Sequence, residues 1–404
     1  MTARQSVERP AVRALVVDDD HLMVDLVSAF LKKSRGYEVE TADDGVVALA
    51  RVAAGGFNLV ITDCIMPHMD GLSLARAIRA LPGVDYVYCI MMTSLGQERS
   101  LVAAMEAGVD DFVSKPLRLE EFGARLQAAE RVIALEAGLA SRNRELAKAY
   151  GQLSRELDFA RAMQLGQLPA PGVFGRVNFE WVFEASSFVG GDIFDYFALD
   201  DRHLCFYVAD VSGHGVAAAM LAFHAQHQLL AASQQALPAA LRQGRDLGVA
   251  AAAVVSEYNR RFLQMKETHQ YLTLLYGVVD MLGDRCALVQ AGHPAPFYSA
   301  SPQAPFLPLG DGGLPIGVLA DAEFEAITVP FAPGARLVLY SDGITDCRNA
   351  GDEAFGEARL RDLLAAQDGA ALAGAGPVLH EALRAWRGRP GFEDDVTFLA
   401  LEVR

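Results

Sequence analysis

Residues 14–20 read ALVVDDD, a short apolar run that ends in three consecutive aspartates. This run, followed directly by the helix-period pattern HLMVDLVSAFLKK, predicts a buried strand that leads into a helix. Strand and helix patterns then alternate up to about residue 125, with further strands predicted in YEVETA, FNLVITD, YVYCIMMTS and DFVSKP. Such alternation favours an α/β, doubly wound, five-stranded parallel sheet whose functional residues lie at the carboxyl ends of the strands.

The composition predicts more than one domain and argues against nucleic acid as a ligand. The chain has 404 residues, 52% apolar and 21% charged, which predicts two or three domains with cores of their own. Its 51 acidic and 35 basic side chains give a formal net charge of −16, which argues against nucleic acid as a direct ligand. The five cysteines are scattered and no apolar run approaches a membrane span. We therefore expect a cytoplasmic protein with reduced thiols that does not interact with a membrane.

Charged and hydroxyl side chains follow four of the five predicted strands. In chain order they are Asp18, Asp19, Asp63, Thr93 and Lys115. Because parallel strands end at one edge of a sheet, these side chains should meet there. Carboxylates held so close together need a cation, which predicts Mg²⁺, and the set would stabilise the charge of a transferring phosphoryl group.

This spacing resembles that of the receiver domains of response regulators, over residues 12–128. The resemblance implies that Asp63 is the phosphorylated residue and that a sensor histidine kinase is the partner that supplies the phosphoryl group. Phe112 stands where that family has an aromatic switch, three residues before the lysine. The Mg²⁺ ligands that the resemblance implies are Asp18, Asp19, Asp63 and the carbonyl of Ile65.

Residues 126–168 have no strand signal, and Leu139, Leu146 and Leu153 recur at intervals of seven. This pattern predicts a long helix, which either forms a parallel coiled-coil homodimer or packs on the domains of its own chain. A strand-rich region follows it, with strands predicted in VNFEWVFEAS, HLCFYVADVS, TLLYGVVDM, RCALVQAG, RLVLYSDG and DVTFLALEV. Helical patterns at roughly 215–232, 248–265 and 357–386 interrupt these strands, which favours an α+β sandwich flanked by helices. We place a receiver domain at 10–128, a helical linker that is a possible coiled-coil dimer at 129–168, and a second domain at 170–404.

Four aspartate motifs flank apolar strands of the C-terminal region. They are Gly190-Gly191-Asp192, ADVSGHG around Asp210, Ser341-Asp342-Gly343 and the pair Asp394-Asp395. Glycines beside three of them permit the tight turns that bring carboxylates to a metal ion. Oxygen ligands select Mg²⁺ or Mn²⁺, and two such ions would activate a water for attack on a phosphate monoester.

These motifs resemble the PPM family of metal-dependent Ser/Thr phosphatases, in particular its SpoIIE/RsbU-like group. The likeness includes VGGDIFDYF, ADVSGHGVAAAM, AGHPAPF, LYSDGITDCRN and DDVTFLAL. It implies that Asp192 and Asp210 bridge two Mn²⁺ or Mg²⁺ ions with the help of the Val211 carbonyl. It further implies that Asp342 and Asp394 hold the outer side of the second ion.

Neighbouring residues receive other roles. Asp395 is the less suitable ligand of its pair, and His293, in a Gly-His-Pro turn, is expected to brace the fold.

The implied function is a response regulator whose phosphatase output, controlled at Asp63, acts on a phosphorylated STAS-type anti-sigma factor antagonist. The alternative is a phosphatase-like adaptor without catalysis that binds a sigma factor or its regulator. The four retained aspartates favour the enzyme.

Overall fold

The computed structural model describes residues 12–94, 105–213, 215–264, 270–366, 372 and 374–404. The chain divides into two compact units, Met1–Gln152 and Leu153–Arg404. Among the described helices, none combines the length and the apolar character that a membrane crossing requires.

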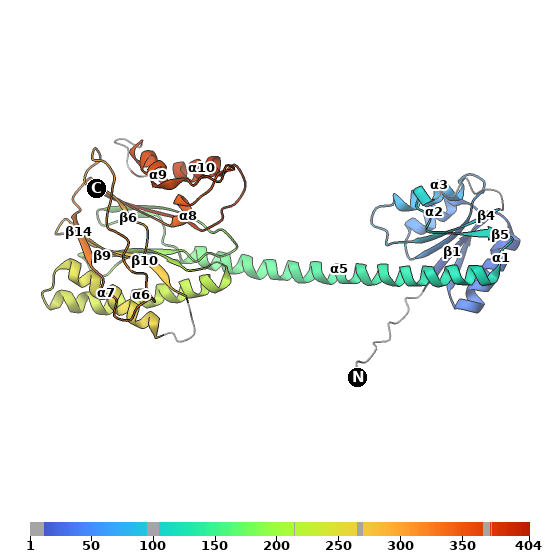
Figure 1. The fold of residues 1–404 in the computed structure, drawn as a ribbon, viewed down its shortest axis with the longest axis horizontal. Coiled ribbons are helices and arrows are strands. Elements are labelled where there is room, and N and C mark those ends of the chain that lie inside the picture. Colours follow the sequence, from blue (N-terminus) through green and yellow to red (C-terminus); the bar gives the residue numbers. More distant parts are fainter. Residues whose placement is uncertain (1–11, 95–104, 214, 265–269, 367–371, 373) are drawn as a thin grey trace. The chain divides into compact units, whose positions relative to one another are not determined.

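The first unit is a five-stranded parallel sheet in the order β2-β1-β3-β4-β5. Helices α2 and α3 cover one face of it, and α1 and the start of α5 cover the other (Figure 1). The strands are β1 Arg13–Val17, β2 Glu38–Ala42, β3 Leu59–Asp63, β4 Tyr88–Ser94 and β5 Asp111–Lys115; the helices before α5 are α1 His21–Phe30, with a π-helical turn over Leu31–Arg35, α2 Gly45–Ala53 and α3 Gly71–Arg79. All five predicted strands and the doubly wound parallel fold are confirmed.

Aspartates start three helices of this unit. Asp20, Asp44 and Asp70 each accept a hydrogen bond from a backbone N–H in the first turn of α1, α2 and α3. Such caps satisfy N–H groups that have no partner inside the helix. In the first of these caps, the Leu22 N–H donates to Asp20 Oδ1 at 2.9 Å, which places Asp20 at the start of α1.

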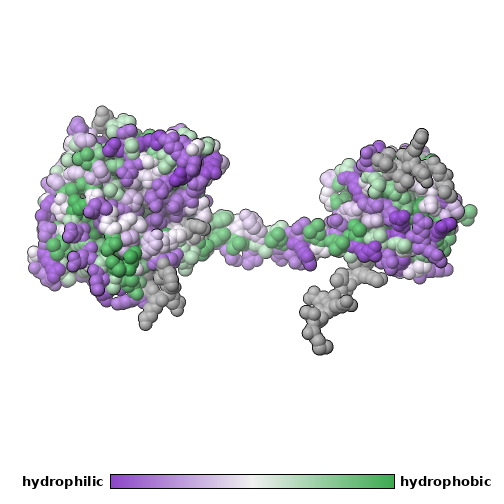
Figure 2. All heavy atoms as spheres, in the orientation of Figure 1, coloured by the Kyte–Doolittle hydropathy of each residue, from purple (hydrophilic) through white to green (hydrophobic). Residues whose placement is uncertain are grey.

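One long helix, α5 Leu119–Gln167, joins the two units. It begins before residue 126, where the sequence analysis placed the start of the helical region, because its first turns complete the core of the first unit. Its apolar residues there, Phe122, Leu126, Ala129 and Ile133, are buried against the sheet. Residues 141–150 are all exposed, and Figure 2 shows apolar and polar residues interspersed along this stretch.

The second unit contains two antiparallel sheets that face each other across an apolar core. One sheet has the order β14-β11-β10-β9-β8 and the other β13-β12-β15-β16-β7-β6. Their strands are β6 Gly172–Phe174, β7 Val177–Glu184, β8 Ile193–Ala198, β9 His203–Val211, β10 Leu272–Asp280, β11 Arg285–Ala291, β12 Phe297–Ser299, β13 Leu307–Pro308, β14 Ala326–Pro330, β15 Arg336–Tyr340 and β16 Val396–Val403. The predicted α+β sandwich is confirmed.

Helices cover the outer faces of both sheets (Figure 1). Helices α6 Val216–Arg242 and α7 Leu247–Leu263 lie on the first sheet, α9 Gly356–Ala365 and α10 Ala375–Arg387 lie on the second, and the short α8 spans Asp342–Thr345. Two helical predictions need correction. The segment expected at 215–232 continues to Arg242, and the one expected at 357–386 is two separate helices.

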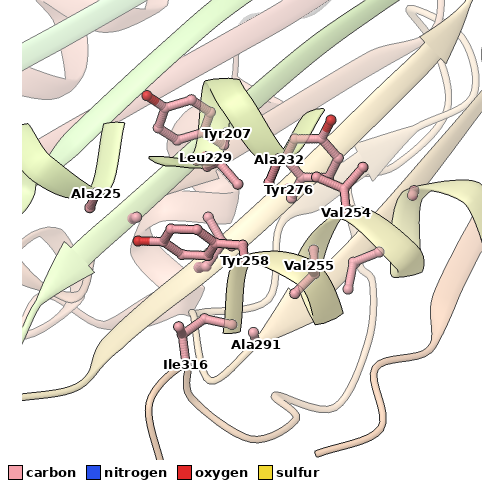
Figure 3. Packing of buried hydrophobic residues seen from close by; sticks show 14 of the residues in the cluster. Tyr207, Ala225, Leu229, Ala232, Val254, Val255, Tyr258, Tyr276, Ala291 and Ile316 are labelled. Atoms are coloured by element: carbon pink, nitrogen blue, oxygen red, sulfur yellow. The ribbon is translucent and has the colours of Figure 1, made fainter. Parts of the chain in front are cut away.

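Aromatic side chains hold α6 and α7 on the first sheet. Tyr207 of β9, Tyr276 of β10 and Tyr258 of α7 meet Leu229 of α6 in this core (Figure 3). The hydroxyl of Tyr276 donates a hydrogen bond to Ser233 of α6 at 3.0 Å. The helices therefore fix β9 and β10, whose ends carry the polar residues described next.

Candidate functional site

The first cluster lies at the carboxyl ends of β1, β3 and β5. Asp18, Asp19 and Asp63 have carboxylate oxygens that all lie within 4.8 Å of one another. Asp18 is buried, and Lys115 Nζ lies 3.0 Å from its Oδ2 and 2.5 Å from Asp63 Oδ1. Oxygen ligands at this spacing fit one hard divalent cation such as Mg²⁺. We call this cluster of Asp18, Asp19, Asp63 and Lys115 the acid pocket.

Lys115 keeps its charge in the acid pocket. Burial acts to lower its pKa, but hydrogen bonds to Asp63 and Asp18 outweigh this and leave the pKa above its ordinary value. A permanently charged ammonium beside Asp63 would stabilise a phosphoryl group on that carboxylate.

The remaining predicted residues of the first unit take distinct positions. Thr93 is half-exposed near the end of β4, paired with Ser114 of β5. The backbone N–H of Ile65 donates to Asp63 Oδ2 at 3.2 Å, and the Ile65 side chain is exposed. Phe112, on β5, packs against the small cluster around Cys64 and lies outside the carboxylate group itself.

Four aspartates of the second unit come from separate turns and influence one another. Burial, Asp342 and Asp394 raise the pKa of Asp210 to about 7. Burial and Asp210 raise the pKa of Asp192 well above its ordinary value, and burial and Asp394 raise that of Asp342. Asp210 is therefore close to Asp192, Asp342 and Asp394, and bound cations would offset the negative charge around it.

The donor set fits divalent cations. In the described residues, these four aspartates do not form a single group as tight as the one in the acid pocket. Carboxylate oxygens are ligands that hard divalent cations such as Mg²⁺ and Mn²⁺ prefer. Asp192 is also held in place, because Thr397 Oγ1 donates to its Oδ2 at 2.6 Å.

Asp395 has a different role from its neighbour Asp394. Its Oδ1 accepts hydrogen bonds from the Ser186 N–H at 2.8 Å and hydroxyl at 2.9 Å, and its Oδ2 accepts one from the Gly191 N–H at 2.6 Å. Asp395 is buried and Asp394 is exposed. These bonds use the oxygens of Asp395 to hold the turn before Asp192, which supports the reading of Asp395 as the less suitable metal ligand.

Two glycines are required by this packing. A Cβ on Gly343 would lie 2.1 Å from the backbone oxygen of Asp395, and a Cβ on Gly190 would lie 2.4 Å from Asp395 Oδ2. Both distances are far shorter than a carbon can tolerate. The glycines of the Ser-Asp-Gly and Gly-Gly-Asp motifs therefore let the two turns approach Asp395.

A cleft of about 410 Å³ opens beside Asp210 and Asp342. We call it the aspartate cleft. Its other polar lining residues are Thr273, Gln290, His293, Asp311, Thr345 and Glu357. None of the described residues that line it is a lysine or an arginine, and three of them are acidic besides Asp210: Asp311, Asp342 and Glu357.

The end of α5 contacts the turn before Asp192. Gln164, which is 3% exposed, donates from Nε2 to the Gly190 carbonyl at 2.9 Å and accepts from the Gly190 N–H at 3.1 Å. This paired contact was not predicted, because its partner is a backbone unit and leaves no pattern in the sequence. It connects the long helix directly to the Gly-Gly-Asp motif.

Two family models match the chain. The family described as "Stage II sporulation protein E (SpoIIE)" matches residues 200–404, and the one described as "Response regulator receiver domain" matches residues 14–127. Phosphoserine phosphatase RsbP of Bacillus subtilis (strain 168) is 29% identical over 196 residues, which is 48% of this chain and 45% of that protein. Response regulator MprA of Mycobacterium ulcerans is 37% identical over 126 residues, 31% of this chain and 53% of that protein.

The chain thus spans about half the length of the curated relatives it matches. Among solved structures, the SiaA-PP2C domain of Pseudomonas aeruginosa matches with a TM-score of 0.53 and 22% identity, over 64% of this chain and 100% of that one. At this identity the match supports the fold of the second unit.

Proposed function

Since the chain belongs to the SpoIIE family and carries a response regulator receiver domain, we propose that it is a response regulator whose output is a Mg²⁺- or Mn²⁺-dependent protein serine/threonine phosphatase. One observation carries the proposal: Asp192, Asp342 and Asp394 lie close enough to Asp210 to influence its ionisation, and Asp210 and Asp342 line an open cleft. A degenerate adaptor would have no need to keep four mutually repelling carboxylates.

The proposed roles of these residues are those that the family resemblance implies. Asp192 and Asp210, with the Val211 carbonyl, would hold the bridged side of two ions, and Asp342 and Asp394 the outer side. When bound, the ions neutralise the phosphoryl oxygens and activate the attacking water. The chain itself supplies rigidity, since Thr397 orients Asp192 by a hydrogen bond.

Control by the receiver would pass through α5. Phosphorylation of Asp63, with Mg²⁺ held by Asp18, Asp19 and the Ile65 carbonyl, would engage Thr93 and reorient Phe112. The structural support is at the other end of the helix, where Gln164 binds both backbone groups of Gly190. A shift or rotation of the last turn of α5 would therefore move the turn that positions Asp192.

We further propose that α5 pairs with α5 of a second copy. Large apolar side chains are exposed along it: Leu135, Leu139, Leu146, Tyr150, Leu153, Phe159 and Met163. Leu139, Leu146 and Leu153 are 55%, 69% and 53% exposed, and they occupy one heptad position. A parallel coiled coil would bury them.

The proposed substrate is a phosphoserine or phosphothreonine on a STAS-type anti-sigma factor antagonist, and the proposed kinase partner is a sensor histidine kinase. The name of the relative RsbP, a phosphoserine phosphatase, supports the substrate class. The lack of lysine and arginine among the described lining residues supports metal-dependent rather than arginine-dependent phosphate binding.

The test is release of phosphate from a phosphorylated STAS protein by the full chain with Mn²⁺. We expect activity in the wild type and a loss of about a hundredfold or more in Asp342→Asn, by analogy with other lost charge-stabilising groups. Asp352→Asn, an exposed aspartate in a turn with φ of 63° that asparagine tolerates, is the matched control. Full activity in Asp342→Asn would refute the metal assignment.

Control is tested separately, by comparing wild type, Asp63→Ala and protein treated with acetyl phosphate. Equal phosphatase rates in all three would refute regulation through Asp63.

A further inference from the structure

The aspartate cleft contains a hydroxyl group that none of the roles above uses. Thr273 of β10 lies directly opposite Asp210 of β9 in the antiparallel pair. Its neighbours Leu272 and Leu274 point into the core under α6 and α7. Because side chains alternate along a strand, Thr273 points to the other face of the sheet, where it lines the cleft beside Asp210.

His293 fixes the orientation of this hydroxyl. Its Nδ1 lies 2.8 Å from Thr273 Oγ1. The imidazole is 1% exposed, and its turn is anchored because Gln290 Nε2 donates to the His293 carbonyl at 2.5 Å. Burial lowers the pKa of His293 to about 3, so the ring is neutral near neutral pH. The histidine expected to brace the fold therefore also braces one side chain of the cleft.

The Thr273 hydroxyl can make a further hydrogen bond to a molecule in the cleft. A threonine hydroxyl has one hydrogen and two lone pairs, of which the bond to His293 uses one. Among the described residues, Thr273 has no second side-chain partner. A water molecule can donate to the remaining lone pair or accept the remaining hydrogen, so it fits this position with either tautomer of the imidazole.

Resting on the phosphatase function proposed above, we propose that Thr273, held by His293, orients the water that attacks phosphorus. The water oxygen forms the new bond to phosphorus while the bond from phosphorus to the serine or threonine oxygen breaks. One water proton passes to that leaving oxygen, the other stays on the phosphate, and no bond to Thr273 forms or breaks. Thr273 and His293 are thus positioning residues.

Two substitutions of Thr273 separate the hydroxyl from the shape of the side chain. Thr273→Val keeps the shape and removes the hydroxyl, whereas Thr273→Ser keeps the hydroxyl. Thr328→Val, on the exposed face of β14 in the same sheet, is the matched control. The substrate is para-nitrophenyl phosphate, with the full chain and saturating Mn²⁺.

We expect Thr273→Val to lower kcat by about ten- to a hundredfold with little change in KM, because misplacing a reacting group costs roughly that much. Thr273→Ser should recover most of the loss, and Thr328→Val should match the wild type.

Two further measurements do not depend on catalysis. Calorimetric titration should give the same Mn²⁺ affinity for Thr273→Val and wild type. The ¹⁵N signals of the His293 ring should shift in Thr273→Val, because its Nδ1 loses its partner.

The outcomes separate the two proposals. Wild-type kcat in Thr273→Val, an equal loss in Thr273→Ser, or a parallel loss of Mn²⁺ affinity would overturn the positioning role and leave the phosphatase function standing. A wild type that hydrolyses neither this substrate nor a phosphoprotein would overturn the phosphatase function, and this inference with it.

Discussion

Asp395→Asn tests whether the two adjacent aspartates have different roles, with Asp395 stabilising the fold and Asp394 binding a metal ion. The substitution replaces one carboxylate oxygen of Asp395 with an amide nitrogen that can only donate. In the wild type Oδ1 accepts two hydrogen bonds from the partly buried Ser186, and Oδ2 accepts from the buried N–H groups of Gly191 and, at 3.3 Å, Asp192. If the NH₂ group faces Gly191, two backbone N–H groups lose their acceptor; if it faces Ser186, the Ser186 N–H loses its acceptor while the hydroxyl can rotate to accept.

The expected magnitude follows from those contacts. A hydrogen bond to a charged group contributes about 1.5–3 kcal/mol, and a buried donor without a partner costs about 1–3 kcal/mol. Losing one side of the carboxylate should therefore destabilise the second unit by roughly 3–5 kcal/mol. At about 2–4 °C per kcal/mol for a unit of this size, its Tm should fall by roughly 6–20 °C.

The assay is calorimetric unfolding of the full chain, in which the transition of Leu153–Arg404 is followed without and with Mn²⁺. Asp394→Asn is the control, because Asp394 is exposed and is proposed to bind metal. We expect it to melt near the wild type without Mn²⁺ and to lose most of the stabilisation that Mn²⁺ provides. If Asp395→Asn melts within about 1 °C of the wild type but loses the Mn²⁺ effect, Asp395 is a metal ligand and the reasoning fails.

Three other predictions concern the same region. Gly343→Ala would place a Cβ 2.1 Å from the Asp395 backbone oxygen and should destabilise the unit by about 1–3 kcal/mol in thermal melts; an unchanged Tm would contradict the packing. Gln164→Leu leaves both backbone groups of Gly190 without their partner and should raise the Mn²⁺ concentration needed for half-maximal activity; an unchanged Mn²⁺ titration would separate α5 from the metal site. The pKa of Asp210 is about 7 in the folded state against an ordinary 3.8, so its contribution to metal-free stability is full below about pH 4 and is lost as pH rises through 7. In the presence of EDTA, the Tm of the wild type should therefore drop more between pH 5 and pH 8 than the Tm of Asp210→Asn. Equal drops in the two proteins would refute this.

Much of the fold and of both clusters could be predicted because they depend on strand ends. Parallel strands bring their carboxyl ends to one edge whatever the loops do, so the order of Asp18, Asp63 and Lys115 along the chain already places them together. In the second unit, aspartates next to glycines indicate turns at strand ends. Asp342 and Asp394, from two of these turns, lie close enough to Asp210 to affect its pKa.

Other features have no local signal. Strand β8 follows the Gly-Gly-Asp motif directly and was missed because its six residues, IFDYFA, include an aspartate and lack a clear period of two. The extension of α6 beyond residue 232 was missed because it contains Pro238, whose cost the surrounding packing overrides. The contacts of Gln164 and Asp395 are with backbone groups distant in sequence, which no motif records.

Because α5 contributes to both units, it limits where fragments of this chain can begin and end. Its first turns complete the first core as far as Ile133, and Glu130 accepts a hydrogen bond from Tyr37, so a fragment ending at residue 128 would leave that core open. A fragment beginning at residue 170 would discard Gln164. A foreign sensory module joined within the exposed stretch 141–150 would leave both interiors intact, but it would interrupt the series Leu139, Leu146 and Leu153 that is proposed to pair with a second copy. Each domain should therefore be expressed together with its own part of the helix.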